Sequence, residues 1–219
     1  MESFNHRGGN KMKKGIFIVV DSGEGAGKTT QIKRAKDFFG DIVVLTREPG
    51  GSPYAEEIRN LILHSPSAGQ ADAKTLFALF WAARADHMKN TIIPALKAGK
   101  MVICDRFDSS TFAYQIVAQG ARDLEKFFWL AREFYLGEFA PDLYVYFDID
   151  PVVGLARKKQ QSAEEQNHFE DRPMEFHTTL QKGFKEFMKG VPHRIIDANK
   201  PIDAVWNDFK AILETSLKQ

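Results

Sequence analysis

The stretch VVDSGEGAGKTTQ, residues 19–31, constrains the fold more than any other part of the chain. An apolar run leads into a glycine-rich turn, and the turn leads into a helical pattern. In that setting backbone amides and a helix N-terminus face an anion, Lys28 places its charge on the outer phosphates, and the Thr29 hydroxyl can bind magnesium. We therefore expect nucleotide phosphates to contact Gly23, Gly25, Ala26, Gly27, Lys28, Thr29 and Thr30.

One position of this loop departs from the usual pattern. The pattern G-x-x-x-x-G-K-[ST] calls for glycine at position 22, where the chain has Ser22 followed by Gly23. Serine fits only if its backbone lies in a region open to L-residues, or if Gly23 takes up the unusual turn. Because the rest of the motif agrees, we expect nucleotide binding; the alternative is a glycine-rich turn with a solvated lysine.

Five short apolar runs, rich in β-branched or aromatic residues, predict strands that are buried on both faces. They lie at 16–20, 42–46, 101–104, 143–149 and 193–197. Helical patterns lie around and between them, at about 28–39, 53–63, 72–97, 122–137, 152–160, 173–189 and 202–217. This alternation predicts an α/β fold of the P-loop NTPase type, a three-layer sandwich with a five-stranded parallel sheet and helices on both faces.

The domain organisation is expected to be simple. Residues 1–14 are polar and aperiodic, which favours a flexible N-terminal extension. No linker interrupts residues 15–219, so we expect a single domain there. The segment RKKQQSAEEQNHFEDR, at 157–172, is almost wholly polar and has two interpretations, a solvated helix end or a mobile lid.

Composition excludes several classes of protein. The formal net charge of +1 argues against a nonspecific nucleic-acid binder, which would carry a clear basic excess. The single cysteine, Cys104, excludes an internal disulfide, and no apolar stretch approaches the length of a membrane span. The first residues lack the apolar segment of a signal peptide. We therefore expect a cytoplasmic protein that binds neither membranes nor nucleic acid.

A second anion site is predicted after the second and third strands, in the strings TREPGG (46–51) and DRFDSSTFAYQ (105–115). In an open parallel sheet, residues that follow neighbouring strands project into one crevice. Arg47 and Arg106 can there hold an acceptor phosphate, while Asp105 orients a magnesium ion, partly through water. Two facing anion sites favour a small-molecule kinase. A GTPase would need N-K-x-D, but NKPID at 199–203 has one residue too many and is expected to cap the last helix.

These two strings, together with LFALFWAARADH at 76–87, resemble thymidylate kinases, a family of P-loop nucleoside monophosphate kinases. The resemblance runs from about residue 15 to the end of the chain. It implies ATP-dependent phosphorylation of dTMP to dTDP with Mg²⁺, in support of dTTP synthesis. It also implies a homodimer formed through helices; the aromatic-rich segments TLFALFWAA and LEKFFWLAREFYL offer apolar surface for one, although core burial alone could explain them.

The resemblance assigns roles to further residues. Phe80 would stack on thymine and Arg84 would bond its carbonyl, and their i, i+4 spacing places both on one helix face. Glu24 would contact the sugar hydroxyl. The remaining dTMP contacts would be Ser110, Thr111, Tyr114 and Gln115, with the Tyr114 ring where a ribose 2′-hydroxyl would otherwise sit.

The expected chemistry is in-line attack of a dTMP oxygen on the γ-phosphorus of ATP. The acceptor is already ionised, so catalysis should depend on positioning and charge neutralisation by Lys28, magnesium oriented by Asp105, Arg106 and a cation from the lid. Some relatives carry an arginine in the phosphate loop, where this chain has Ala26, so the lid must supply that charge. Arg157 is the first candidate; Lys158, Lys159 and Arg172 are the others, because His168 replaces an expected arginine.

Two alternatives to a thymidylate kinase fit parts of the sequence. One is a nucleoside monophosphate kinase with another acceptor, since Phe80 and Arg84 fit a pyrimidine but cannot alone distinguish its 5-methyl group. The other is a nucleotide-binding regulator without turnover, which the departures at Ser22 and His168 would allow.

Overall fold

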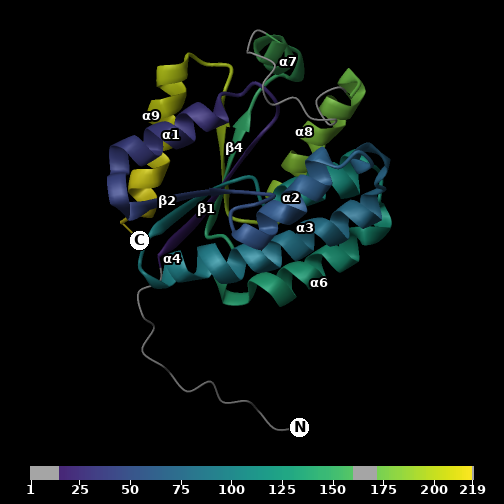
Figure 1. The fold of residues 1–219 in the computed structure, drawn as a ribbon. Coiled ribbons are helices and arrows are strands. Elements are labelled where there is room, and N and C mark those ends of the chain that lie inside the picture. The colour runs from purple at the N-terminus through teal and green to yellow at the C-terminus, as the bar shows by residue number, and fades with distance from the viewer. Residues whose placement is uncertain (1–14, 160–171, 219) are drawn as a thin grey trace, which may run out of the picture.

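The structure is a computed structural model, and it describes residues 15–159 and 172–218 (Figure 1). The predicted extension at 1–14 and most of the predicted lid therefore lie outside the described residues. Within the described ranges, no helix combines the length and the apolar character that crossing a bilayer requires.

The centre of the molecule is the predicted five-stranded parallel sheet. Its strands are β1 (Ile16–Ser22), β2 (Val43–Arg47), β3 (Met101–Asp105), β4 (Leu143–Asp148) and β5 (His193–Asp197). They are ordered β2-β3-β1-β4-β5, and every neighbouring pair is parallel. The register pairs Val20 with Asp105 and Arg47 with Asp105, so the ends of β1, β2 and β3 meet at one edge. The loops predicted to bind anions follow these three ends.

Helices cover both faces of the sheet. One face carries α1 (Lys28–Phe39) and α9 (Ile202–Ser216), which lie together at the left of Figure 1. The other carries α3 (Ala73–His87), α4 (Ile93–Lys97), α6 (Glu125–Leu136) and α8 (Met174–Met188), with α2 (Pro53–His64) packed against α3. Helix α7 (Pro151–Lys159) follows β4 beyond the carboxyl end of the sheet. These layers confirm the predicted three-layer sandwich.

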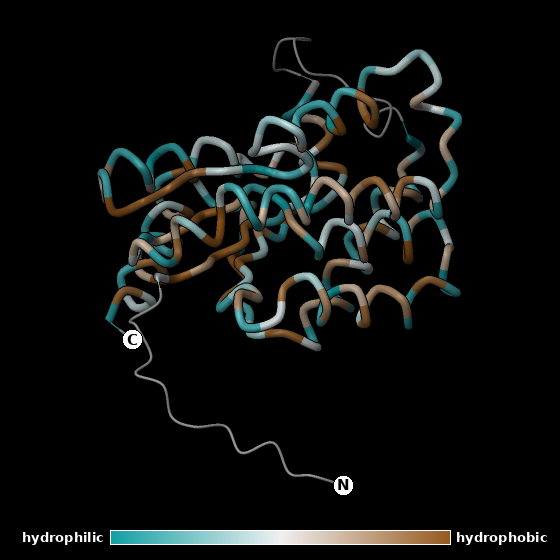
Figure 2. The backbone as a smooth tube through the Cα atoms, turned by 60° about the horizontal axis from the view of Figure 1, so that its bottom comes forward, coloured by the Kyte–Doolittle hydropathy of each residue, from teal (hydrophilic) through white to brown (hydrophobic). Residues whose placement is uncertain are grey.

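Alternate residues of the strands feed two separate cores, because successive side chains of a strand point to opposite faces. In β1, Phe17 and Val19 pack with α3, α6 and α8, whereas Ile18 and Val20 pack with α1 and α9. All four side chains are fully buried, so the strand is apolar without interruption from Ile16 to Val20. Figure 2 shows the hydrophobic segments running through the interior of the fold.

Two helical regions differ from the predictions. The helix expected over 72–97 is divided into α3, a π-helical segment η3 (Met88–Ile92) and α4. Pro94 has no amide hydrogen to donate, so the regular hydrogen-bond ladder cannot run through it unchanged. A helix that the sequence analysis did not predict follows β3, comprising α5 (Asp108–Thr111) and the π-helical segment η4 (Phe112–Ala118). Its β-branched and aromatic residues give it weak intrinsic helix propensity, so packing determines it.

Candidate active site

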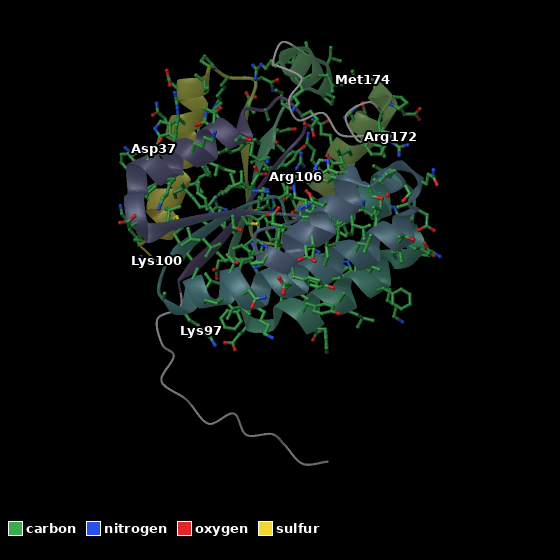
Figure 3. The ribbon with its side chains drawn as sticks, in the orientation of Figure 1. Asp37, Lys97, Lys100, Arg106, Arg172 and Met174 are labelled. Carbon is green, nitrogen blue, oxygen red and sulfur yellow. The ribbon has the colours of Figure 1, made fainter. Side chains whose placement is uncertain are left out.

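A cleft of about 860 Å³ opens where β1, β2 and β3 end. Its walls are the loop after β1, the loop after β2, the α5–η4 helix, and one side each of α2 and α3. Arg106, labelled near the centre of Figure 3, lies at this edge of the sheet. The cleft brings together every site residue predicted from the sequence except Arg157. These are Gly23, Glu24, Gly25, Ala26, Gly27, Lys28, Thr29, Thr30, Arg47, Phe80, Arg84, Asp105, Arg106, Ser110, Thr111, Tyr114 and Gln115.

Ser22 does not distort the phosphate loop. It is the last residue of β1 and pairs with Phe147 of β4, and its backbone avoids positive φ. The turn is made instead by Gly25 and Gly27, with φ of 68° and 76°. Gly25 also needs to be glycine for a second reason, because a Cβ there would lie 1.9 Å from the carbonyl oxygen of Gly154 in α7. The departure from the usual pattern is therefore compatible with an intact loop.

Lys28 is buried at the start of α1, and its Nζ donates to the Asp105 carboxylate. Burial and the neighbouring Arg106 guanidinium outweigh the nearby carboxylates and lower the pKa of Lys28 to about 7. A polyphosphate beside Nζ would favour the charged form and raise that pKa again. The neutral fraction of the Lys28 amine would therefore take up a proton when an anion enters the loop.

The arginines at the acceptor end are held by carboxylates. Arg106 has a positive φ of 65°, and its Nη2 lies 3.1 Å from Glu24 Oε1. Its guanidinium also lies over the Tyr114 ring, 5.6 Å from the centroid. Arg47 Nη2 lies 3.0 Å from Glu56 Oε2 on α2, at a half-exposed position. An anion in the cleft would meet two cations whose orientations the protein already restricts.

A buried carboxylate lies behind this end of the cleft. Asp21 of β1 accepts hydrogen bonds from the hydroxyls of Ser109 and Ser110, the latter at 2.8 Å. Burial raises the pKa of Asp21, and the two hydroxyls and Arg106 oppose that rise. The predicted dTMP contact Ser110 therefore has its hydroxyl directed at Asp21, which fixes its orientation beside the cleft.

The far end of the cleft is built around Arg84 of α3. Its guanidinium carbon lies over the rings of Trp81 and Phe107, 4.5 Å and 4.9 Å from their centroids. Its Nη1 is buried and has no hydrogen-bond partner within the described part of the chain, and the same holds for Oε1 of Gln115. Both residues line the same cleft, so it is bordered by a side chain with an unpaired donor and a side chain with an unpaired acceptor. Phe80 lines it as well, so ring and guanidinium can meet one flat ligand, as predicted.

The cation that α7 directs to the cleft differs from the first candidate. Arg157 donates to the carbonyl oxygens of Ala198 and Asn199, at 2.9 Å and 3.3 Å, and does not line the cleft. The next residue, Lys158, does line it. Adjacent residues of a helix point about 100° apart, so one faces the β5 loop while the other faces the cleft. Arg172, two residues before α8, lies over the Phe176 ring, and His168 lies outside the described residues.

Several cleft residues were missed by the sequence analysis. Glu48 and the α2 side chains Arg59, Asn60 and His64 line the cleft, and His87 lies behind Glu48. Glu48 stands within TREPGG and His87 ends LFALFWAARADH, so both lie in strings that were already singled out. The α2 residues stand in an ordinary amphipathic pattern, which gives no functional signal.

The donor set at the phosphate end suits magnesium. In the described ranges, no cluster of three or more histidine, cysteine, aspartate or glutamate side chains forms a metal site. Thr29 and Asp105 nevertheless both line the cleft, beside the loop that would hold phosphates. Magnesium in kinases typically takes one or two protein oxygens and completes its shell with phosphates and water. A hydroxyl and a single carboxylate therefore fit that ion.

Comparisons with known proteins agree with this geometry. A family model described as thymidylate kinase matches residues 20–209. The thymidylate kinase of Anoxybacillus flavithermus is 40% identical over 209 residues, covering 93% of this chain and 99% of the relative, and that of Clostridium novyi is 38% identical over 208 residues, covering 93% and 100%. The crystal structure of thymidylate kinase from Ehrlichia chaffeensis matches with a TM-score of 0.71 and 28% identity, covering 92% of this chain and 99% of that one. The chain belongs to the thymidylate kinase family, whose members phosphorylate dTMP to dTDP with ATP.

Proposed function

We propose that the cleft carries out in-line transfer of the γ-phosphoryl group of ATP to the phosphate of dTMP, with ATP on the loop after β1 and dTMP between α3 and the α5–η4 helix. The observation that carries this assignment is the meeting of two anion sites in one cleft. Lys28 lies at one of them, and Arg47 and Arg106 at the other, at adjacent strand ends. Such an arrangement aligns donor and acceptor phosphates.

At the donor side, the amides of the glycine-rich loop and the start of α1 bind the phosphates of ATP. The contacts are those of Gly23, Gly25, Ala26, Gly27, Lys28, Thr29 and Thr30. Thr29 and Asp105 would hold Mg²⁺, Asp105 partly through water, and the ion when bound neutralises phosphate charge. Asp105 accepts from Lys28 Nζ, so the carboxylate and the phosphates of ATP would compete for that amine.

At the acceptor side, Arg106 and Arg47 bind the phosphate of dTMP and hold its oxygen in line with the γ-phosphorus. Glu24, already paired with Arg106, is positioned to accept from the sugar hydroxyl. The base lies against Phe80 and Arg84, with Thr111 and Gln115 beside it. Ser110 and Tyr114 complete the wall at the sugar, where the Tyr114 ring leaves no room for a 2′-hydroxyl.

A lid cation completes the charge that phosphoryl transfer requires. We assign this role to Lys158 rather than to Arg157, because Lys158 lines the cleft while Arg157 is bound to the carbonyl oxygens that follow β5. Arg157 would then anchor α7. We also propose that residues 15–219 form one kinase domain, with the segment at 157–172 as its lid; the family match over 20–209 supports a single unit.

A homodimer is supported by the outer surface of α6. Phe127, Leu130 and Phe134 are 61%, 54% and 81% exposed and follow the i, i+3, i+7 spacing of one helix face. Apolar stripes of this kind mark interaction sites. Light scattering should give twice the chain mass, and Phe134→Asp should shift the protein to monomer. If the wild-type protein is a monomer, the proposed homodimer is wrong, while the proposed activity is unaffected.

The proposed cellular location and binding partners of this enzyme follow from its composition. Cys104 is buried and free, which suits the reducing cytoplasm. The near-neutral net charge of +1 supports small-molecule substrates rather than nucleic acid as partners.

The test is turnover with a panel of nucleoside monophosphates. Purified protein with ATP and magnesium should release ADP rapidly with dTMP, more slowly with dUMP, and negligibly with AMP or GMP. Preference for a purine monophosphate would contradict the base-site assignment. Binding of ATP and dTMP without any ADP release would instead indicate a nucleotide-binding regulator.

A further inference from the structure

A buried ion-pair network lies behind the base end of the cleft. Glu48, in the loop after β2, is 6% exposed, and Arg84 and His87 of α3 are 1% and 0% exposed. Glu48 Oε2 accepts from Arg84 Nε at 2.9 Å and lies 2.7 Å from Nη2, while Glu48 Oε1 lies 3.1 Å from His87 Nδ1. One carboxylate therefore joins two side chains that are one helical turn apart.

The contacts of Arg84 leave one part of its guanidinium for a ligand. Nε and Nη2 face Glu48, and Nη2 also donates to Thr111 Oγ1 at 3.1 Å. The rings of Trp81 and Phe107 fix the plane of the group. Nη1 is buried and remains without an acceptor in the described part of the chain. Because plane and in-plane rotation are both fixed, the free N–H groups can point in one direction only.

His87 holds Glu48 from behind. An ionised carboxylate only accepts hydrogen bonds, so Nδ1 carries the proton toward Glu48, and Nε2 is hydrogen-bonded to Thr46 Oγ1 at 2.6 Å. The surrounding loop is shaped to this pair, since a Cβ on Gly51 would lie 2.3 Å from His87 Nε2 and 2.5 Å from Thr46 Oγ1. The hydrogen-bonded chain from Thr46 through His87 and Glu48 to Arg84 is thus continuous.

We propose that Glu48 and His87 are positioning residues that determine base selectivity by fixing the direction of Arg84 Nη1. This inference rests on the proposed binding of dTMP in the cleft. The free Nη1 donor and the free Gln115 Oε1 acceptor complement a pyrimidine edge with a 4-oxo group and an N3–H. A 4-amino pyrimidine reverses both groups and would set donor against donor and acceptor against acceptor. The network therefore excludes cytosine-type bases.

The decisive variant is Glu48→Gln, which keeps the shape but cannot accept from both Arg84 and His87. Binding of dTMP and of dCMP is measured by calorimetry without ATP, alongside kcat and KM with ATP. We expect KM and Kd for dTMP to rise on the order of ten-fold, with kcat changed by less than about two-fold. The preference for dTMP over dCMP should fall by a similar factor.

Two further variants separate positioning from stability. Arg132→Gln breaks another ion pair with a buried carboxylate, that of Asp108 at 2.8 Å. Within the described ranges, neither side chain of this pair bonds to Glu48, Arg84 or His87, and neither lines the cleft. It should lower the melting temperature without changing the ratio of dTMP to dCMP affinity. His87→Asn keeps an amide donor at the Nδ1 position and should preserve most of the preference, whereas His87→Gln, which places its amide at the Nε2 position, should lose it.

The outcomes distinguish this inference from the proposed function. If Glu48→Gln loses thermal stability but keeps the wild-type ratio of dTMP to dCMP affinity, the network is structural and the inference is wrong. If His87→Asn and His87→Gln lose the preference for dTMP over dCMP equally, His87 is not a positioning residue. A wild-type protein that shows no preference for dTMP over dCMP would also overturn the inference. Wild-type protein that binds dTMP selectively but releases no ADP would contradict the proposed function alone.

Discussion

The two ends of the cleft handle charge in opposite ways. At the base end, Arg84 and Glu48 are buried as an ion pair, so the direction of the unpaired Arg84 Nη1 is fixed by the protein before a ligand binds. At the phosphate end, Lys28 and Arg106 are paired with Asp105 and Glu24, carboxylates that line the same cleft and compete with phosphate. The side chains at the base end are therefore preorganised for the ligand. At the phosphate end, the substrate phosphates must replace the carboxylates that pair with Lys28 and Arg106.

The largest effect should come from the phosphate end. Lys28→Ala removes the cation that meets the transferred group, so kcat should fall by at least about a hundred-fold, while dTMP affinity changes little. Steady-state kinetics combined with calorimetry of dTMP binding measures both quantities. An unchanged rate would show that the loop after β1 does not bind the donor.

The next largest effect is a difference in unfolding free energy between variants at the two ends of the cleft. Arg84→Gln leaves Glu48 buried without its cation and should cost about 3–5 kcal/mol of unfolding free energy. Arg47→Gln breaks a half-exposed pair and should cost less than about 1 kcal/mol, although it weakens dTMP binding. Denaturant titration of both variants gives the two values. Similar losses in the two would contradict the distinction between a preorganised end and an exchanging one.

A smaller effect concerns protons at the phosphate end. Since burial lowers the pKa of Lys28 to about 7, the free protein at about pH 8 holds this amine largely neutral, and the phosphates of ATP should restore its charge. ATP binding should then take up close to one proton at about pH 8, and the uptake should vanish as the pH falls below about 6. Calorimetry in buffers of different ionisation enthalpy measures it, with Lys28→Met as the control. Uptake that persists in Lys28→Met would assign the proton to another group.

The smallest effect on dTMP turnover is expected at the sugar wall. Tyr114→Ala should leave the rate with dTMP within about three-fold but raise turnover of the corresponding ribonucleotide about ten-fold, because a steric barrier is removed. The ratio of kcat/KM for the two nucleotides is the measurement. If the variant rejects the ribonucleotide as strongly as wild type, discrimination does not depend on the Tyr114 ring.

The two ends also differ in how well the sequence predicts them. The sequence alone identified most residues that line the cleft at the phosphate end, because Gly25, Gly27, Lys28 and Thr29 are close in sequence and follow a buried strand; their contacts with phosphate stay a prediction. The five strands were predicted for the same reason, since short apolar runs report burial on both faces.

What could not be predicted depends on contacts between distant segments. The bond between Glu48 and His87 joins residues that are 39 positions apart, and no local pattern reports it. Whether Arg157 or Lys158 faces the cleft depends on the rotation of α7 about its axis. The sequence does not determine this rotation, because adjacent basic residues are equally good candidates. The α5–η4 helix was missed because packing outweighs the weak propensity of its sequence.

The most direct test is a crystal structure with dTMP, magnesium and a non-hydrolysable ATP analogue. It should keep the bonds of Glu48 to Arg84 and His87 unchanged and show Arg84 Nη1 donating to the 4-carbonyl of thymine. Lys28 should have left Asp105 for the outer phosphates, with Arg106 on the phosphate of dTMP. A complex in which the Glu48 network has rearranged while the pair of Lys28 and Asp105 persists would contradict the division between the two ends.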